Sequence, residues 1–74
     1  MIYADLLKNH LISKSYNIKE VSIQGDKYIR SVDIKFNDYN NFNKEDLKKD
    51  IDEYLMDNYE YYNISKPEIL IKIV

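Results

Sequence analysis

The clearest secondary-structure signal in the chain is the stretch Lys27-Tyr28-Ile29-Arg30-Ser31-Val32-Asp33-Ile34-Lys35-Phe36. Apolar and polar residues alternate along it, which is typical of a strand with one buried face and one wet face. Val32, Ile34 and Phe36 lie on the same side, and we predict that this side faces the core. The other side is predicted to face water, and it carries Lys27, Ser31, Asp33 and Lys35.

A second strand is predicted directly before this one, over residues 18–24, with Val21 and Ile23 on one face. The dipeptide Gly25-Asp26 follows it. Glycine at the first central position is typical of a two-residue type II′ turn, because only glycine adopts the required positive φ at little cost. Gly25 is the single glycine of the chain. The pattern therefore predicts an antiparallel hairpin whose strands are joined by a two-residue turn.

Two helices are predicted, one on each side of the hairpin. Residues 3–15 place side chains at helical spacings of three and four, in a stripe made of Tyr3, Leu6, Leu7, His10 and Leu11. The second helix begins after Asn43, a favoured N-cap residue, with Asp46 in the capping-box position. It is predicted to run to Tyr59 or Tyr61, and its buried stripe consists of Leu47, Ile51, Tyr54 and Leu55.

The last predicted element is a strand over residues 68–74, which follows a loop over residues 63–66 that Pro67 ends. This strand is apolar on both faces, since Ile69, Ile71 and Ile73 lie on one face and Leu70 and Val74 on the other. Such a strand is either a central or covered strand, or an edge that meets a partner.

The order of elements is α-β-β-α-β, which predicts one small α+β domain spanning residues 1–74. Both helices are expected to pack on one face of a three-stranded sheet. We favour an all-antiparallel sheet of order 2-1-3, with strand 68–74 beside strand 18–24, because antiparallel pairs are the more frequent. The alternative is a parallel pair between strand 68–74 and strand 27–36, joined through the second helix.

The composition excludes several classes of protein. The chain of 74 residues has no cysteine and a net charge of −2. A chain of this size buries only about 63% of its surface, which allows one small core. Without thiols, neither a disulfide scaffold nor a thiolate metal site is available. No stretch approaches the ~20 apolar residues of a membrane span. The start Met1–Asp5 has no basic segment, so we expect a cytoplasmic protein of a bacterial host.

The sequence contains no constellation that predicts catalysis or metal binding. His10 is the only histidine, and no nucleophile and carboxylate set accompanies it at helical spacing. We expect His10 at the margin of the buried stripe, bonded to backbone or water. The acids of the second helix recur at spacings of three and four, but one helix face cannot surround a cation. We therefore expect no enzyme activity, no catalytic residue, no metal, no cofactor and no small-molecule substrate.

The uneven distribution of charge is the most informative feature. Residues 50–65 contain no lysine or arginine but hold several acids and tyrosines. On the second helix, Met56 falls opposite the buried stripe, beside acidic neighbours one turn away. Tyrosine gives rigid contact area, methionine adapts to irregular partners, and carboxylates attract a basic surface. The predicted partner-binding residues are Asp52, Glu53, Met56, Asp57, Tyr59, Glu60 and Tyr61.

This face predicts a non-enzymatic module that binds a basic protein surface, such as that of a nucleic-acid-binding effector. Frequent Ile, Asn, Lys and Tyr residues indicate an AT-rich coding sequence, typical of a low-GC bacterium or its phage. In size, charge and lack of catalytic motifs, the chain resembles small acidic phage proteins such as anti-CRISPR inhibitors and nucleic-acid mimics. This resemblance implies an inhibitor or anti-defence protein of a phage or mobile element.

Two other functions fit the sequence. The connection order resembles that of type II KH domains, which implies nucleic-acid binding. In this alternative, Tyr28 stacks on bases and the hairpin supplies Lys19, Lys27, Arg30 and Lys35. The GXXG loop of that family is absent from the sequence. The second alternative is a structural phage component that forms a homodimer through strand 68–74.

Overall fold

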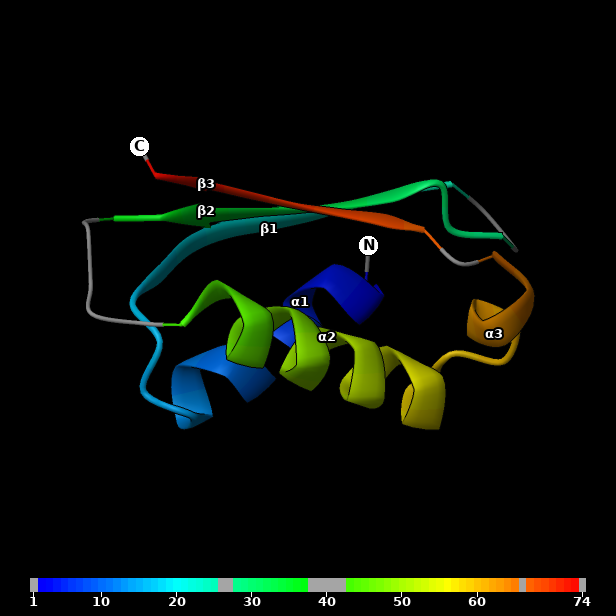
Figure 1. The fold of residues 1–74 in the computed structure, drawn as a ribbon, viewed down its shortest axis with the longest axis horizontal. Coiled ribbons are helices and arrows are strands. Elements are labelled where there is room, and N and C mark those ends of the chain that lie inside the picture. Colours follow the sequence, from blue (N-terminus) through cyan, green and yellow to red (C-terminus); the bar gives the residue numbers. More distant parts are fainter. Residues whose placement is uncertain (1, 26–27, 38–42, 66, 74) are drawn as a thin grey trace.

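The computed structural model describes residues 2–25, 28–37, 43–65 and 67–73. In chain order it contains α1 Ile2–Ser13, β1 Ile18–Gln24, β2 Ser31–Phe36, α2 Lys44–Asn58, α3 Tyr62–Ser65 and β3 Glu68–Ile73. The three strands form one sheet, and the helices lie on one side of it, so the fold has two layers (Figure 1). The predicted α+β class is confirmed, and so is the packing of both long helices on one face.

β2 is the central strand, because the sheet order is β1-β2-β3. It pairs antiparallel with β1 and parallel with β3, so that Ile34 lies between Val21 and Ile71. The favoured all-antiparallel order 2-1-3 is therefore wrong, and the alternative parallel pair is the one that forms. The physical reason lies in β1, which carries the exposed Lys19 and Glu20 at a shift of register. Charged side chains and register shifts suit an edge strand better than a central one.

The connection between β1 and β2 is longer than the predicted two-residue turn. The ladder ends at the pair Gln24 and Ser31, so residues 25–30 connect the strands. Ile29 in this connection is buried, as is Val32 in β2. Side chains alternate along a strand, so two residues three apart cannot both face the core on a regular strand. Because Ile29 is buried as well as Val32, the chain before Ser31 does not continue the regular strand, and β2 begins at Ser31.

Gly25 has a positive φ of 113°, the region that the turn pattern predicts for it. The Arg30 N–H donates a hydrogen bond of 2.7 Å to the Gln24 carbonyl oxygen and closes the connection. A Cβ on Gly25 would collide with the Tyr28 carbonyl oxygen. Glycine is thus required here both for its backbone conformation and for the close approach of the chain. Residues 26–27, which include Asp26 of the predicted turn, lie outside the described part of the chain.

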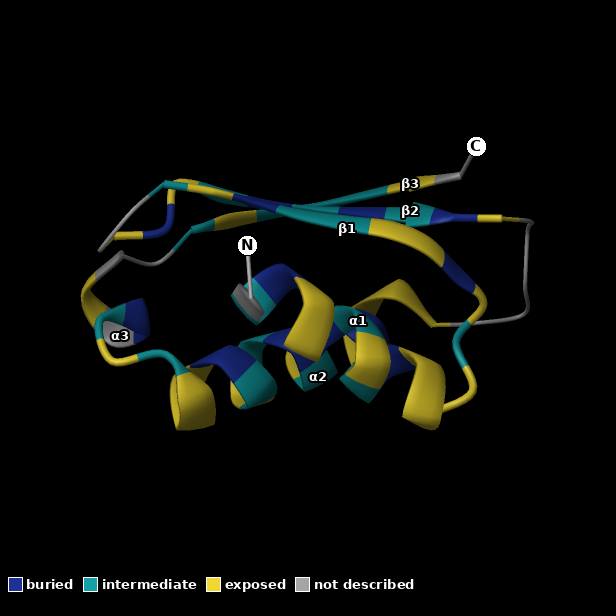
Figure 2. Ribbon diagram, turned by 180° about the vertical axis from the view of Figure 1, so that it is seen from behind, coloured by how far each residue is buried: buried dark blue, intermediate teal, exposed yellow. Residues whose placement is uncertain are grey.

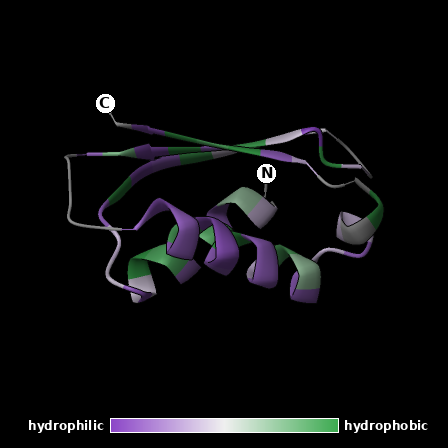
Figure 3. Ribbon diagram, viewed as in Figure 1, coloured by the Kyte–Doolittle hydropathy of each residue, from purple (hydrophilic) through white to green (hydrophobic). Residues whose placement is uncertain are grey.

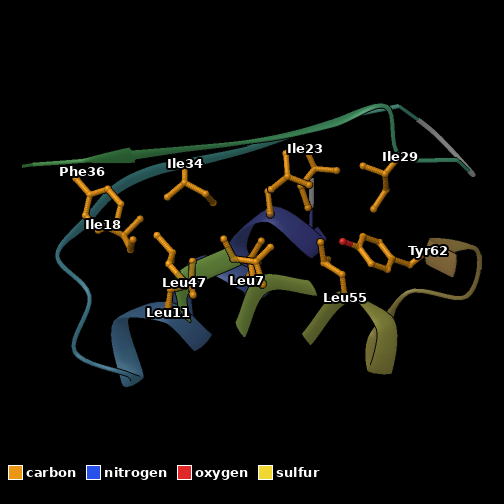
Figure 4. Packing of buried hydrophobic residues seen from close by; sticks show 13 residues of the cluster. Leu7, Leu11, Ile18, Ile23, Ile29, Ile34, Phe36, Leu47, Leu55 and Tyr62 are labelled. Atoms are coloured by element: carbon orange, nitrogen blue, oxygen red, sulfur yellow. The ribbon is translucent and has the colours of Figure 1, made fainter. Parts of the chain in front are cut away.

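The core lies between the sheet and the helices, and Figure 4 shows its main side chains. β2 contributes Val32, Ile34 and Phe36, which are fully buried as predicted. Tyr62 of α3 closes the core at the end opposite Phe36 (Figure 4). The long helices contribute Leu7, Leu11, Leu47, Ile51 and Leu55. Buried residues face each other across the two layers, while the outer sides of the helices are exposed (Figure 2).

The start of α2 is fixed by a side-chain cap, as the sequence predicts. Asn43 Oδ1 accepts hydrogen bonds from the backbone N–H groups of Glu45, at 2.8 Å, and Asp46, at 3.3 Å.

In α1 the buried stripe differs from the prediction at one position. Leu6 is 43% exposed, and Ala4 packs in the core instead.

The end of α2 is defined by Tyr59, whose extended conformation (φ −118°, ψ 116°) stops the helix at Asn58. The helix is therefore slightly shorter than predicted. The chain then forms α3, a helix of four residues, where the sequence predicts a loop over residues 63–66. Lys66 lies outside the described residues. This short helix places Tyr62 in the core and leads the chain into β3.

Replacing Ile34 with alanine tests the position of β2. We expect Ile34→Ala to lower the free energy of unfolding by about 2–4 kcal/mol, because the side chain is fully buried and leaves a cavity. The matched control is Ile12→Ala, since Ile12 is 48% exposed and should cost less than about 0.5 kcal/mol. Urea unfolding followed by circular dichroism measures both values. Equal losses in the two variants would contradict the described register of β2.

Candidate protein-binding surface

The seven residues predicted to bind a partner lie on α2 and in the turn that follows it. Hydrophilic residues predominate along α2, as Figure 3 shows. Residues four apart in a helix lie one above the other, so Asp52 and Met56 share one side of α2 and Glu53 and Asp57 share the next. The predicted patch is therefore divided between two sides of the helix, which have different surroundings.

Asp52 and Met56 line a groove of about 550 Å³ between α2 and β3. The other residues of its lining are Glu45, Lys48, Lys49, Tyr62, Pro67 and Ile69. Charges of both signs therefore lie near Asp52 and Met56, whereas the sequence predicts acidic neighbours beside Met56. Ile69, which β3 contributes to the groove, was not part of the predicted site, because neither spacing nor composition shows which strand lies next to α2.

Asp52 also has a structural partner. The Asp52 carboxylate lies beside the hydroxyl of Tyr62, close enough to raise its pKa. Burial raises the pKa of the Tyr62 hydroxyl well above its usual value, and the neighbouring Asp52 carboxylate raises it further. Since Tyr62 is only 4% exposed, this pair joins α2 to α3 at the end of the core. The Asp52 carboxylate is therefore only partly available to an external partner.

Glu53, Asp57 and Glu60 form what we call the acidic edge, and all three are exposed. Glu53 and Asp57 lie one turn apart on α2, and Glu60 lies in the turn that follows. Within the described ranges, the ion pairs join His10 to Asp50 and Lys35 to Glu20, and none involves the acidic edge. No lysine or arginine among the described residues neutralises the carboxylates of the acidic edge.

The two tyrosines of the predicted site pack against different parts of the fold. The Tyr59 ring lies 4.6 Å from the Tyr3 ring of α1, measured between centroids. The Tyr61 ring lies 5.3 Å from the ring of Tyr28 in the β1–β2 connection. Both residues are half-buried, so each offers only part of its ring to a partner. Met56 is 47% exposed.

One polar contact between the long helices was not predicted from the sequence. The His10 imidazole donates a hydrogen bond of 2.9 Å from Nε2 to the Asp50 carboxylate, and its ring stacks on Tyr54 at 4.4 Å. We expected His10 to bond to backbone or water. The two partners are 40 residues apart, so no local spacing indicates their contact. This cluster removes Asp50 from the set of available carboxylates.

The described ranges hold no group of three or more histidine or acidic side chains that could bind a metal ion. None of the described helices has the length and apolar character needed to cross a bilayer. Comparisons with known protein families, with curated proteins and with solved structures found no match to this chain.

The burial of the Tyr62 hydroxyl, with Asp52 beside it, raises its pKa and makes stability depend on pH in the alkaline range. The pKa of Tyr62 is raised in the folded state, so the neutral hydroxyl stabilises the fold below its unfolded pKa of about 10. Above that pH the free energy of unfolding should fall by up to about 1.4 kcal/mol per pH unit. Tyr62→Phe is expected to lack this part of the decline. The measurement is urea unfolding at a series of alkaline pH values.

The matched control for Tyr62→Phe is Tyr61→Phe, which removes a hydroxyl from the preceding residue. At neutral pH, Tyr62→Phe should cost no more than about 1 kcal/mol, because the partly exposed Asp52 can bind water instead. If both variants lose stability at alkaline pH as steeply as the natural protein does, the described burial of the Tyr62 hydroxyl beside Asp52 is wrong.

Proposed function

We propose that the protein is a non-enzymatic binding module whose acidic edge docks on a basic surface of another protein. The observation that carries the proposal is the exposure of Glu53, Asp57 and Glu60 without any lysine or arginine partner in the described structure. The surrounding stretch, residues 50–65, contains no basic residue in the sequence. Exposed charges of one sign steer the approach of a partner of opposite sign.

The chemistry of the acidic edge favours an arginine-rich partner. Carboxylates accept paired hydrogen bonds from a guanidinium group, which gives orientation as well as attraction. Met56 and the half-exposed rings of Tyr59 and Tyr61 border the acidic edge and supply apolar contact area. Basic, arginine-containing surfaces of this kind occur where proteins bind nucleic acid. The functional class that we propose is an inhibitor occupying such a surface, for example a phage protein acting against a host nuclease.

The structure supports the alternative, direct binding of nucleic acid by the hairpin, less well. Lys35 pairs with Glu20 at 3.7 Å, which partly neutralises it. The Tyr28 ring already packs against Tyr61, although 47% of the residue is exposed. Phosphate neutralisation dominates the affinity of nucleic-acid-binding proteins, and the chain as a whole is acidic. These features favour a protein partner.

Reversing two charges of the acidic edge tests the proposal. Glu53→Lys/Glu60→Lys should weaken binding of an oligoarginine peptide by at least about tenfold, with little change in thermal stability, since both residues are exposed. The control, Asp5→Lys/Glu20→Lys, changes net charge equally at exposed positions of α1 and β1. Isothermal titration at low and at physiological ionic strength measures both affinities.

The control should bind more tightly than the acidic-edge variant. If the two double variants bind the peptide equally, the acidic edge has no special role and the binding reflects net charge alone. In a gel-shift assay at low salt, the natural protein should not bind labelled duplex DNA or labelled single-stranded RNA, so neither probe should change its mobility. A salt-sensitive shift of either probe would support the hairpin alternative and contradict the proposal.

A further inference from the structure

β3 is an edge strand with one free side. In the sheet that the structure describes, β2 is its neighbour on one side and no strand lies on the other (Figure 1). Such an edge presents backbone N–H and C=O groups that another strand can bind. Ile69 and Ile71 pack against the core but remain half-exposed. A strand placed beside β3 would both satisfy this edge and cover these side chains.

The sequence of β3 is complementary to itself when it is read in the opposite direction. Its first five residues are Glu68-Ile69-Leu70-Ile71-Lys72. In an antiparallel pair of two such strands centred on Leu70, Glu68 of each strand lies opposite Lys72 of the other, and Ile69 lies opposite Ile71. The paired strands would therefore contain two opposite-charge pairs with a continuous apolar centre between them. Opposite-charge and apolar cross-strand pairs stabilise antiparallel sheets.

The charges next to β3 point to the same arrangement. Lys72 lies opposite Lys35 of β2 in the register of the sheet, and like charges placed opposite each other are unfavourable. Lys35 has its own acidic neighbour in Glu20 of β1. Lys72 forms no ion pair within the described residues. Glu68 of a second β3 would place an acid beside Lys72, as Glu20 of β1 does for Lys35.

The groove beneath the free edge has room for the apolar side of an incoming strand. It measures about 550 Å³, and Met56, Tyr62 and Ile69 form its apolar part. Isoleucines on the inner face of a second β3 would enter this space. The rim of the groove on α2 carries Glu45 and Asp52 as well as Lys48 and Lys49, a mixture of signs that does not repel an identical surface.

We infer that β3 pairs antiparallel with β3 of a second copy of this chain, with Leu70 at the two-fold axis. The two sheets then form one six-stranded sheet, three strands from each copy. A stable dimer buries roughly 800 Å² on each partner, about one sixth of the 4898 Å² surface of the chain. The strand edge and the groove together supply the contact. The acidic edge is not part of this contact, although Met56, which borders the acidic edge, also lines the groove.

Charge exchange within β3 tests the inference. The natural protein should sediment as a dimer that dissociates on dilution, in analytical ultracentrifugation over a range of concentrations. In Lys72→Glu two glutamates would face each other at both symmetric contacts, and in Glu68→Lys two lysines would do so. Each single variant should weaken dimerisation by roughly tenfold to a hundredfold. Both residues are exposed, so circular dichroism should show an unchanged fold.

An equimolar mixture of the two single variants is the decisive arm of the experiment. In a mixed dimer every lysine again faces a glutamate, so dimerisation should return to nearly the affinity of the natural protein. Lys19→Glu is the matched control, because it changes the charge equally at an exposed position of β1 on the opposite edge of the sheet. It should leave the affinity within about twofold.

Three results would overturn the inference. The natural protein could remain monomeric at concentrations up to about 1 mM, which would mean that any self-association is negligible. The single variants could dimerise as well as the natural protein, which would place the contact elsewhere. The mixture could stay monomeric while each variant is folded, which would show that Glu68 and Lys72 do not face each other across the interface.

Discussion

The burial of one face of β2 is the constraint on which the rest of the structure depends. Val32, Ile34 and Phe36 have no exposed surface, and they occupy the only strand that pairs on both sides in the described sheet. Burying a side chain of this size is worth about 1.5–3 kcal/mol, a large share of the net stability of a small domain. Once β2 takes the centre, β1 and β3 become edges, and both long helices must cover the face that β2 presents.

Local features of the structure could be predicted from the sequence because their causes are local. Alternation along β2 identified its buried face, and Asn43 identified the start of α2, since a cap acts on its own next residues. The order of the strands could not be derived in this way. It depends on which strand tolerates an edge position. The exposed Lys19 and Glu20 of β1 indicate an edge strand, but our prediction rested on the frequency of antiparallel pairs alone.

The candidate site was predictable in composition and not in geometry. The absence of lysine and arginine over residues 50–65 indicated exposed carboxylates, and within the described residues Glu53, Asp57 and Glu60 form no ion pair. The sequence could not show that Asp52 lies beside Tyr62 or that Asp50 binds His10, because each contact depends on packing between different elements. These two contacts divide the acids of α2 into those that hold the fold together and those that face solvent.

The two sides of α2 therefore have different properties. The acidic edge carries charge of one sign, whereas the groove beside β3 carries both signs together with apolar side chains. A surface of one sign favours a partner of opposite charge, and a mixed surface is compatible with a copy of itself. A protein of 74 residues can in this way present one surface to a foreign partner and another to a second copy of the chain.

The position of β2 is tested most directly by amide hydrogen exchange, followed by nuclear magnetic resonance at each residue of β1 and β2. A central strand has every amide bonded to one neighbour or the other, whereas an edge strand leaves alternate amides open to water. The structure predicts slow exchange throughout β2 and alternating slow and fast exchange along β1. Slow exchange throughout β1, with alternation in β2, would contradict the strand order and the account built on it.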